Sequence, residues 1–286
     1  MGGEALGEHM LCLRPVCVVM AMLSAMCIEA PVSAQNSSVL DELNVKITGT
    51  AGYTSETLGS LNGSTPRELV TPFANVGAEF AHGNWFFGLE AGARSMSGTI
   101  GSGPTALSVN SRGLRTTGYV AHQLVPGLIA GLGGVYQLDT GSLSNDFVDV
   151  DAMLEGGELL PFLLAFVPVA DGKFEIGANG NLVRARLRIQ GQPTDFFNTY
   201  DAEFGVKWAG PVHQLIMLEL GGTGRYTFRE DVVLGGASRA KLSARFEAAL
   251  SFAIDTNTEV MLSGYYRAFD ELLSEDGVNL QIKRSF

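Results

Sequence analysis

Cysteine is almost absent from this 286-residue chain. Its three cysteines, Cys12, Cys17 and Cys27, all lie in an apolar amino-terminal segment that reads as a removable leader. Once that segment is cleaved, the chain has no thiol for a disulfide framework or a thiolate metal site. Disulfide-stabilised folds and cysteine-based metal centres are therefore excluded.

Basic charge is also in short supply. The chain has 19 Lys and Arg against 30 Asp and Glu, a formal net charge of -11. A surface that binds nucleic-acid phosphates needs a basic excess. We therefore expect no nucleic-acid partner.

Long apolar runs and catalytic motifs are missing as well. Hydrophobic residues make up 46% of the chain, yet after residue 30 no run reaches the roughly 18 to 20 uncharged residues of a membrane helix. No GxSxG, HExxH or phosphate-loop motif follows the leader. His82, His122 and His213 each lie beside a different expected turn. We therefore expect no enzymatic activity, no cofactor and no metal centre.

The amino terminus has the features of an export signal. Arg14 precedes the apolar run VCVVMAMLSAMCI, and Val32, Ser33 and Ala34 provide small residues at the expected cleavage offsets. The sequence therefore predicts a cleaved signal peptide at 1-34 and a short periplasmic lead-in at 35-42. An amino-terminal membrane anchor is the alternative, but the run is short and is followed by Pro31.

The rest of the chain alternates apolar and polar residues. The stretch LNVKITGTAGY at 43-53 keeps period two over eleven residues, which matches the roughly 9 to 11 residues of a tilted membrane-spanning strand. Similar stretches predict about twelve strands, the others lying around 73-81, 84-96, 107-123, 127-138, 147-168, 173-189, 197-208, 213-228, 237-254, 259-268 and 277-286.

The connections between these strands alternate in length. Tight turns are expected at 82-84, 125-127, 170-172, 209-211 and 255-257, where Gly, Pro, Asn and Asp favour turn geometry. Longer connections are expected at about 54-72, 97-106, 139-146, 190-196, 229-236 and 269-276. Short periplasmic turns and longer external loops are typical of membrane barrels. The sequence predicts an all-β, antiparallel up-and-down transmembrane β-barrel of about twelve strands over 43-286.

Aromatic residues gather at both ends of the expected strands. Such belts form at the two lipid interfaces, whereas the buried face of a soluble sheet has no reason to form them. The tight-turn belt is expected to contain Trp85, Tyr119, Trp208, Phe252 and Phe286, and the outer belt Tyr53, Phe73, Tyr136, Tyr200, Tyr226 and Phe228.

Two stretches depart from the alternation. Leu159 to Val169 is apolar on both faces and contains Pro161 and Pro168, which indicates a bulge, an inward apolar patch or a strand end packed on an element in the lumen. At Leu182-Val183 the face assignment slips by one residue, which predicts a second bulge.

The carboxyl-terminal stretch GVNLQIKRSF carries a family resemblance. Val278, Leu280 and Ile282 alternate with polar residues before the terminal Phe286. This ending resembles the final strand of Gram-negative outer-membrane β-barrels. The resemblance implies location in the bacterial outer membrane, recognition of Phe286 by the barrel assembly machinery, and outer-membrane lipid and lipopolysaccharide as partners.

Charged residues at inward positions carry the expectation about function. A ladder of arginines on one strand, with acids beside it, and a basic wall on the later strands are predicted to line the pore. The predicted pore-lining residues are Arg184, Arg186, Arg188, Arg225, Arg239, Lys241, Arg245, Arg267, Glu219, Glu247, Asp201 and Glu203.

These features predict a narrow channel for small polar solutes with some preference for anions. The arrangement resembles that of the narrow, arginine-lined porins that pass acidic sugars, although no motif specific to that family is present. A structural or adhesion barrel plugged by the 54-72 loop is the alternative, and an enzyme acting on outer-membrane lipid is a further one. The solute, the oligomeric state and the openness of the lumen are left open.

Deleting Phe286 tests the resemblance at the carboxyl terminus. We expect the deletion to impair insertion into outer membranes more than it lowers the stability of barrels already folded in detergent. Insertion is measured by the folded fraction in membranes. Equal insertion with and without Phe286 would contradict an assembly role for this residue.

Overall fold

The computed structural model describes residues 44-58, 67-230, 241-268 and 273-286. The expected leader and lead-in therefore lie outside the described residues. The elements are β1 (Asn44–Leu58), β2 (Arg67–His82), β3 (Trp85–Ile100), the 3-10 helix η1 (Gly103–Thr105), β4 (Leu107–Val125), β5 (Leu128–Ser144), β6 (Asp149–Val169), β7 (Gly172–Ile189), β8 (Asp195–His213), β9 (Ile216–Glu230), β10 (Leu242–Ala253), β11 (Thr258–Ala268) and β12 (Leu273–Ser285).

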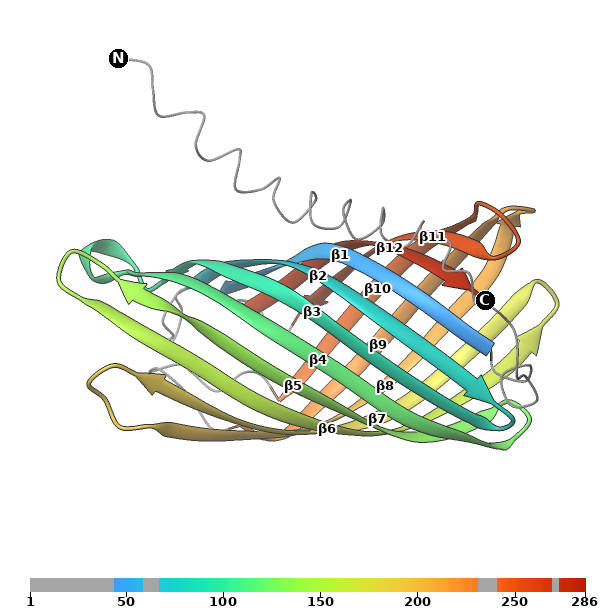
Figure 1. Ribbon diagram of the computed structural model, residues 1–286, viewed down its shortest axis with the longest axis horizontal. Helices are drawn as coiled ribbons and strands as arrows, with labels where there is room; N and C mark the ends of the chain where they lie inside the picture. The colour runs from blue at the N-terminus through green and yellow to red at the C-terminus, as the bar shows by residue number, and fades with distance from the viewer. Residues whose placement is uncertain (1–43, 59–66, 231–240, 269–272) are drawn as a thin grey trace, which may run out of the picture.

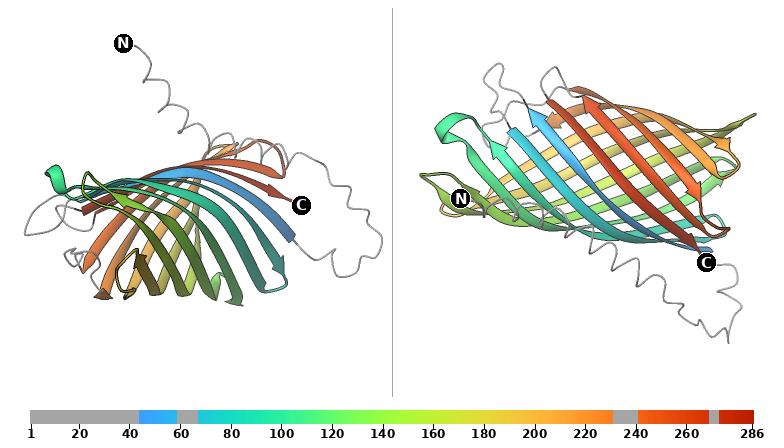
Figure 2. Two further views of the ribbon diagram at one scale, coloured as in Figure 1. Left: turned by 60° about the vertical axis from the view of Figure 1, so that its left-hand side comes forward. Right: turned by 90° about the horizontal axis from the view of Figure 1, so that it is seen from above.

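The twelve strands form one closed antiparallel barrel. Each strand pairs with its neighbours in the chain, and β12 pairs with β1 to close the sheet. Phe286 extends this seam, because its backbone N–H donates a hydrogen bond to the carbonyl oxygen of Val45 at 2.9 Å. Figures 1 and 2 show the tilted strands, with front and back walls crossing in opposite directions. The predicted up-and-down barrel of twelve strands is confirmed.

Contacts across the barrel identify its inner face. Arg267 on β11 reaches Glu203 on β8 over the two intervening strands, with a nitrogen-to-oxygen distance of 3.1 Å. Arg94 on β3 reaches Asp139 on β5, past β4. Side chains converge in this way only on the concave face. Because directly paired residues share a face of the sheet, the strand register then assigns inside and outside all round the barrel.

The outer face of the barrel is apolar. On β10, Leu242, Phe246 and Leu250 are 67%, 63% and 38% exposed and alternate with inward residues. Large apolar side chains exposed all round a closed barrel are stable in hydrocarbon, and closure pairs the backbone groups that lipid cannot satisfy. No helix in the described residues is long and apolar enough to cross a membrane.

Most predicted belt residues lie on the outer face, among them Tyr53, Trp85 and Tyr136, which are all exposed. Two predictions are wrong. Tyr119 and Phe73 lie on the inward face by register, because Tyr119 pairs with Gly88 and Phe73 pairs with Arg94. The aromatic ring of Tyr119 meets the ring of Phe162 on β6 inside the barrel.

Glycine and aspartate shape the tight turns. Gly83 and Gly127 have φ angles of 56° and 82°, which favour glycine. A Cβ at Gly127 would also lie 2.9 Å from the carbonyl oxygen of Phe166. In the turn between β10 and β11, the Asp255 carboxylate accepts a hydrogen bond from the backbone N–H of Asn257 at 2.7 Å, and this bond lowers the pKa of Asp255.

One predicted turn is misplaced. The expected turn at 209-211 is strand, and β8 continues to His213 before turning at 214-215. The register with β9 shifts between Pro211 and His213. Such an irregularity accommodates a proline, which has no N–H to donate to the ladder.

Several strands extend beyond their expected ends at the loop end: β1 continues to Leu58 and β5 to Ser144, where the sequence predicts ends near 53 and 138. β6 has close to the length expected from 147-168, and its 21 residues are about twice the roughly 9 to 11 needed to span a membrane. The predicted 54-72 loop is largely strand, since β1 continues to Leu58 and β2 starts at Arg67. Its remaining residues, 59-66, lie outside the described part of the chain. In Figure 1 the β3–β4 and β5–β6 hairpins extend this end of the barrel at the left.

The predicted bulge at Leu182-Val183 is wrong. The register of β7 with β6 and with β8 stays constant through these residues. The only break in the β6–β7 ladder within the described residues is the missing pairing at Leu160 and Pro161, with no change of register on either side. Leu160, Phe162 and Leu164 face inward there, so of the three options for this stretch the structure has the inward apolar patch.

A disulfide across the β1–β12 seam tests closure. Thr50 and Gln281 are paired, and the Gln281 amide donates to the Thr50 hydroxyl at 3.3 Å. Introducing Thr50→Cys with Gln281→Cys is expected to give a spontaneous disulfide, seen by mass spectrometry of the non-reduced protein. As a control, Thr50→Cys with Ser263→Cys places the thiols two strands apart, about 10 Å, beyond disulfide reach. Absence of the seam disulfide would contradict closure.

Candidate functional site: the lumen

The lumen is lined on one side by paired charges from β7 to β11. Arg225 on β9 contacts the carboxylate of Asp201 on β8, and Arg267 contacts Glu203. Lys207 lies between two carboxylates, with its Nζ 3.2 Å from Glu219 and 3.9 Å from Glu175. The basic groups of this wall are therefore compensated by acids.

Arg245 on β10 has a mixed environment. Its guanidinium lies 3.3 Å from the carboxylate of Glu247 and 4.0 Å above the ring of Tyr265 on β11. The Tyr265 hydroxyl donates to Glu275 on β12 at 2.6 Å. A continuous network thus joins β10, β11 and β12 on the inner wall.

Asp201 is the most enclosed acid of the wall. Its side chain has 0% exposure. Besides Arg225, it accepts a hydrogen bond of 2.6 Å from the amide of Asn181 on β7. A buried carboxylate is tolerated only when its oxygens are satisfied in this way, so Asp201 joins β7, β8 and β9.

The opposite wall repeats this pairing on a smaller scale. The Arg94 Nε donates to Asp139 at 2.8 Å, and the Gln137 amide donates to the same carboxylate at 3.0 Å. Gly113, on the strand between Arg94 and Asp139, provides the space, because a Cβ there would lie 1.9 Å from an Asp139 oxygen. Glu90 accepts a hydrogen bond of 3.0 Å from Asn75.

An apolar ridge on the inner face of β6 faces the charged wall formed by β7 to β11. The register places Leu160, Phe162, Leu164 and Phe166 inward. Between this ridge and the charged wall lies a cavity of about 400 Å³, lined by Leu160, Phe162 and Leu164 on one side and by Glu175, Lys207 and Glu247 among others on the other. The lumen therefore offers both apolar and charged surface within one cavity.

The sequence predicts an inward apolar patch as one option for the Leu159 to Val169 stretch, but none of its residues is among the predicted pore-lining residues, which are all charged. The available signal was the run LLPFLLAFVPV itself, since a strand that is apolar on both faces contributes apolar side chains to lipid and to the lumen.

The structure places seven predicted pore-lining residues on the inward face. They are Asp201, Glu203, Glu219, Arg225, Arg245, Glu247 and Arg267. Lys241 immediately precedes β10. Arg239 lies outside the described residues.

The prediction that Arg184, Arg186 and Arg188 point into the lumen is wrong. Arg184 and Arg186 follow the outward Leu182 at alternate positions, and Arg186 pairs directly with the exposed Phe196. Arg188, two residues further along β7, also lies on the outer face. Without the expected bulge at Leu182-Val183, every later residue of β7 keeps the face opposite to the predicted one.

No group of three or more His, Cys, Asp or Glu residues in the described part of the chain could hold a metal ion. His122 lies on the outer face, where its ring contacts Trp85 at 4.6 Å between ring centres. The arrangement inside the barrel can bind and orient solutes through ionic, hydrogen-bonding and apolar contacts.

Comparison with known proteins agrees with the fold. No protein-family model matches the sequence, and a search of curated proteins found no match. Among solved structures, the translocator domain of the autotransporter NalP from Neisseria meningitidis has a TM-score of 0.68 at 12% identity, covering 95% of this chain and 98% of that one. The transport unit of AIDA-I from Escherichia coli gives 0.62 at 14% identity, with coverage of 95% and 98%.

An outer-membrane channel from Pseudomonas putida F1 is also similar, with a TM-score of 0.52 at 11% identity and coverage of 90% and 99%. At these identities the likeness concerns the fold. With its closed sheet and apolar exterior, the chain is a β-barrel of the bacterial outer membrane.

Removing the Asp201 charge tests the luminal network. We expect Asp201→Asn to lower the free energy of unfolding by about 2 kcal/mol, since hydrogen bonds to charged groups contribute roughly 1.5 to 3 kcal/mol. Urea unfolding in detergent, followed by tryptophan fluorescence, measures this change. Asp149→Asn, at an exposed outward position of β6, serves as the control, with an expected change within about 0.5 kcal/mol. Equal effects of the two substitutions would contradict the structural role of Asp201.

Proposed function

We propose that this barrel is a passive channel for small polar and amphipathic solutes. The observation that carries the proposal is the luminal cavity of about 400 Å³, where the apolar β6 ridge faces Lys207, Glu175 and Glu247. A solute with an apolar part and a charged or hydroxylated part finds a partner for each in that cavity.

The charge balance favours cations over anions. The basic groups on β8 to β11 are neutralised by carboxylates at close range, which removes the basic wall on which the expected anion preference rests. Inward carboxylates outnumber inward basic groups among the strand residues whose side chains are described. The acids are Glu56, Glu79, Glu90, Asp139, Glu158, Glu175, Asp195, Asp201, Glu203, Glu219, Glu247, Glu259 and Glu275, against Lys46, Arg94, Arg115, Lys173, Lys207, Arg225, Arg245, Arg267 and Lys283.

A lumen lined in this way attracts cations electrostatically, and lumen charge tunes selectivity. The likeness to an outer-membrane channel supports a transport role. A structural barrel plugged by the 54-72 loop and a lipid-modifying enzyme are the alternatives, and the cavity between the β6 ridge and the charged wall favours the channel over a plugged lumen.

Planar bilayers measure the proposed activity directly. Reconstituted full-length protein is expected to give discrete conductance steps, with a reversal potential in a KCl gradient that indicates preference for K⁺. The absence of steps above background would contradict the channel.

Glu158 is the residue with which to alter selectivity. It lies on the inward face of β6, opposite Val183, and has no ion-pair partner within 4.0 Å in the described part of the chain. Glu158→Gln is expected to move the reversal potential toward zero, because a negative luminal charge that is not held in an ion pair is lost. The outward Asp149→Asn serves as control and should leave it unchanged. A shift of equal size in both variants would contradict luminal control of selectivity.

A further inference from the structure

The three β7 arginines that the sequence predicts in the lumen lie instead on the outside of the barrel, where they form part of a basic surface. The register places Arg184, Arg186 and Arg188 of β7 outward, together with Arg112 of β4, which pairs with the outward Thr140 of β5. We call these four residues, with the side chains between them on β5 and β6, the external arginine surface. The chain as a whole is acidic, so this local basic surface requires an explanation.

The external arginine surface begins where the lipid-facing surface ends. Toward the loop end, Leu114 on β4 and Leu182 on β7 are the last exposed apolar outward residues, at 63% and 45% exposure. The next outward residue on β4 is Arg112, and on β7 it is Arg184. Beyond the apolar band of an outer-membrane barrel lies the headgroup layer of the outer leaflet, which is the level of these guanidinium groups.

Only part of this positive charge is compensated by the protein. Arg186 donates to Glu155 on β6 at 2.8 Å through its Nε, and the Tyr136 hydroxyl donates to the same carboxylate at 3.0 Å. The guanidinium of Arg184 lies 5.7 Å from the ring centre of Phe196.

Arg112 and Arg188 are exposed. Within the described residues, neither has a carboxylate oxygen within the 4.0 Å of an ion pair. The remaining acids of this surface, Asp149 and Asp151, lie farther along β6. Two guanidinium groups therefore remain available to an external anion.

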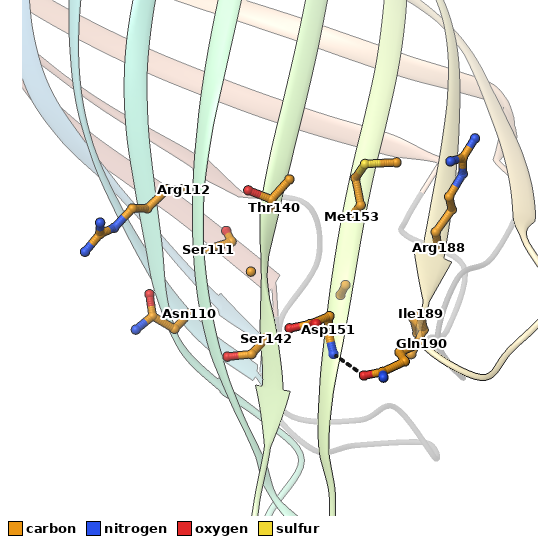
Figure 3. Close-up of a pocket in the computed structure, with 12 residues that line it drawn as sticks. Asn110, Ser111, Arg112, Thr140, Ser142, Asp151, Met153, Arg188, Ile189 and Gln190 are labelled. Atoms are coloured by element: carbon orange, nitrogen blue, oxygen red, sulfur yellow. Dashed lines mark hydrogen bonds between the residues drawn. The ribbon is translucent and has the colours of Figure 1, made fainter.

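A hollow of about 750 Å³ lies between these two arginines. Arg112, Thr140, Met153 and Arg188 form one cross-strand row over β4 to β7. The ends of this row are three strand spacings apart, about 14 Å. Figure 3 shows Arg112 and Arg188 at opposite sides of the hollow, with the shorter side chains between them.

The second row of the hollow is polar. It contains Asn110, Ser142, Asp151 and Gln190, and the Gln190 side-chain oxygen accepts the Asp151 N–H at 3.5 Å. Hydroxyl and amide groups of this kind bind sugar hydroxyls. Two guanidinium groups about 14 Å apart, with Thr140 and Met153 between them and the amides, hydroxyl and carboxylate of the second row beside them, suit a saccharide that carries phosphates at both ends, since arginine binds phosphate through parallel N–H donors.

We propose that the external arginine surface binds the phosphorylated saccharide headgroup of an outer-leaflet glycolipid. Arg112 and Arg188 contact its phosphates, and Asn110, Thr140 and Ser142 contact its sugars. The acyl chains then lie on the apolar surface below, along Leu114 and Leu182. This site is on the outside of the barrel and is independent of any solute path through the lumen.

Binding is tested with folded full-length protein in phosphatidylcholine bicelles that contain defined amounts of bisphosphorylated lipid A. Native mass spectrometry measures the bound glycolipid. We expect the wild-type protein to bind bisphosphorylated lipid A at least tenfold more tightly than the fully dephosphorylated glycolipid. Equal binding of the two lipids would overturn the proposal, and this comparison needs no variant.

The double variant Arg112→Gln with Arg188→Gln tests the residues. We expect it to lose at least tenfold in affinity for bisphosphorylated lipid A. Arg284→Gln is the matched control, because Arg284 is outward on β12 at the opposite, tight-turn end, and should bind as the wild type does. Unchanged affinity in the double variant would overturn the assignment.

Inorganic phosphate distinguishes a headgroup site from a general anion site. Millimolar phosphate is expected to leave lipid A bound, because the saccharide and the acyl chains add contacts that free phosphate lacks. Displacement of lipid A by millimolar phosphate alone would overturn the glycolipid assignment, as would equally tight binding of phosphatidylglycerol.

Discussion

The structure depends on the requirement that every backbone N–H and C=O group within the bilayer be hydrogen-bonded inside the protein. A hydrocarbon environment provides no partner for these groups, so an open sheet edge is unstable there. Pairing of β1 with β12 meets the requirement, and the bond from the Phe286 N–H to Val45 extends the seam to the last residue. In the closed ladder each side chain points either into the lumen or toward the lipid, and the register decides which. It places Tyr119 inward and Arg186 outward.

This constraint explains which features were predictable. Strand number, antiparallel order and most of the tight turns follow from local patterns, such as the period-two alternation at 43-53 and the glycines at 83 and 127. The ends of several other strands do not follow from those patterns, because β1, β2 and β5 continue into polar sequence that resembles a loop, whereas the extents of β6 and β7 agree closely with the expected 147-168 and 173-189. Pro211 likewise predicts a turn, but a register shift accommodates it within β8.

The face of a residue was harder to predict than its strand. A face can be read from alternation only if the register is unbroken, and one assumed bulge at Leu182-Val183 reversed every residue after it. Asp201, Arg225 and Arg267 were placed correctly because their strands alternate cleanly over the central section. Their partners were not predictable in the same way. Arg267 meets Glu203 over two intervening strands, and such a contact depends on barrel curvature, which no single strand encodes.

The two sets of arginines illustrate how environment determines what a basic side chain does. Inside the barrel, Arg225, Arg245 and Arg267 each lie against a carboxylate, because a charge enclosed by a narrow lumen needs a nearby counter-charge. Outside, Arg112 and Arg188 have no such partner in the described residues. Water alone would satisfy them on a soluble protein, where an exposed arginine needs no explanation. Directly above a lipid-facing surface, however, the neighbouring phase is a headgroup layer with its own anions. An arginine on the inner face therefore stabilises the barrel wall, whereas an arginine on the outer face is available to the membrane. A shift of one residue along a strand moves a side chain from one face to the other.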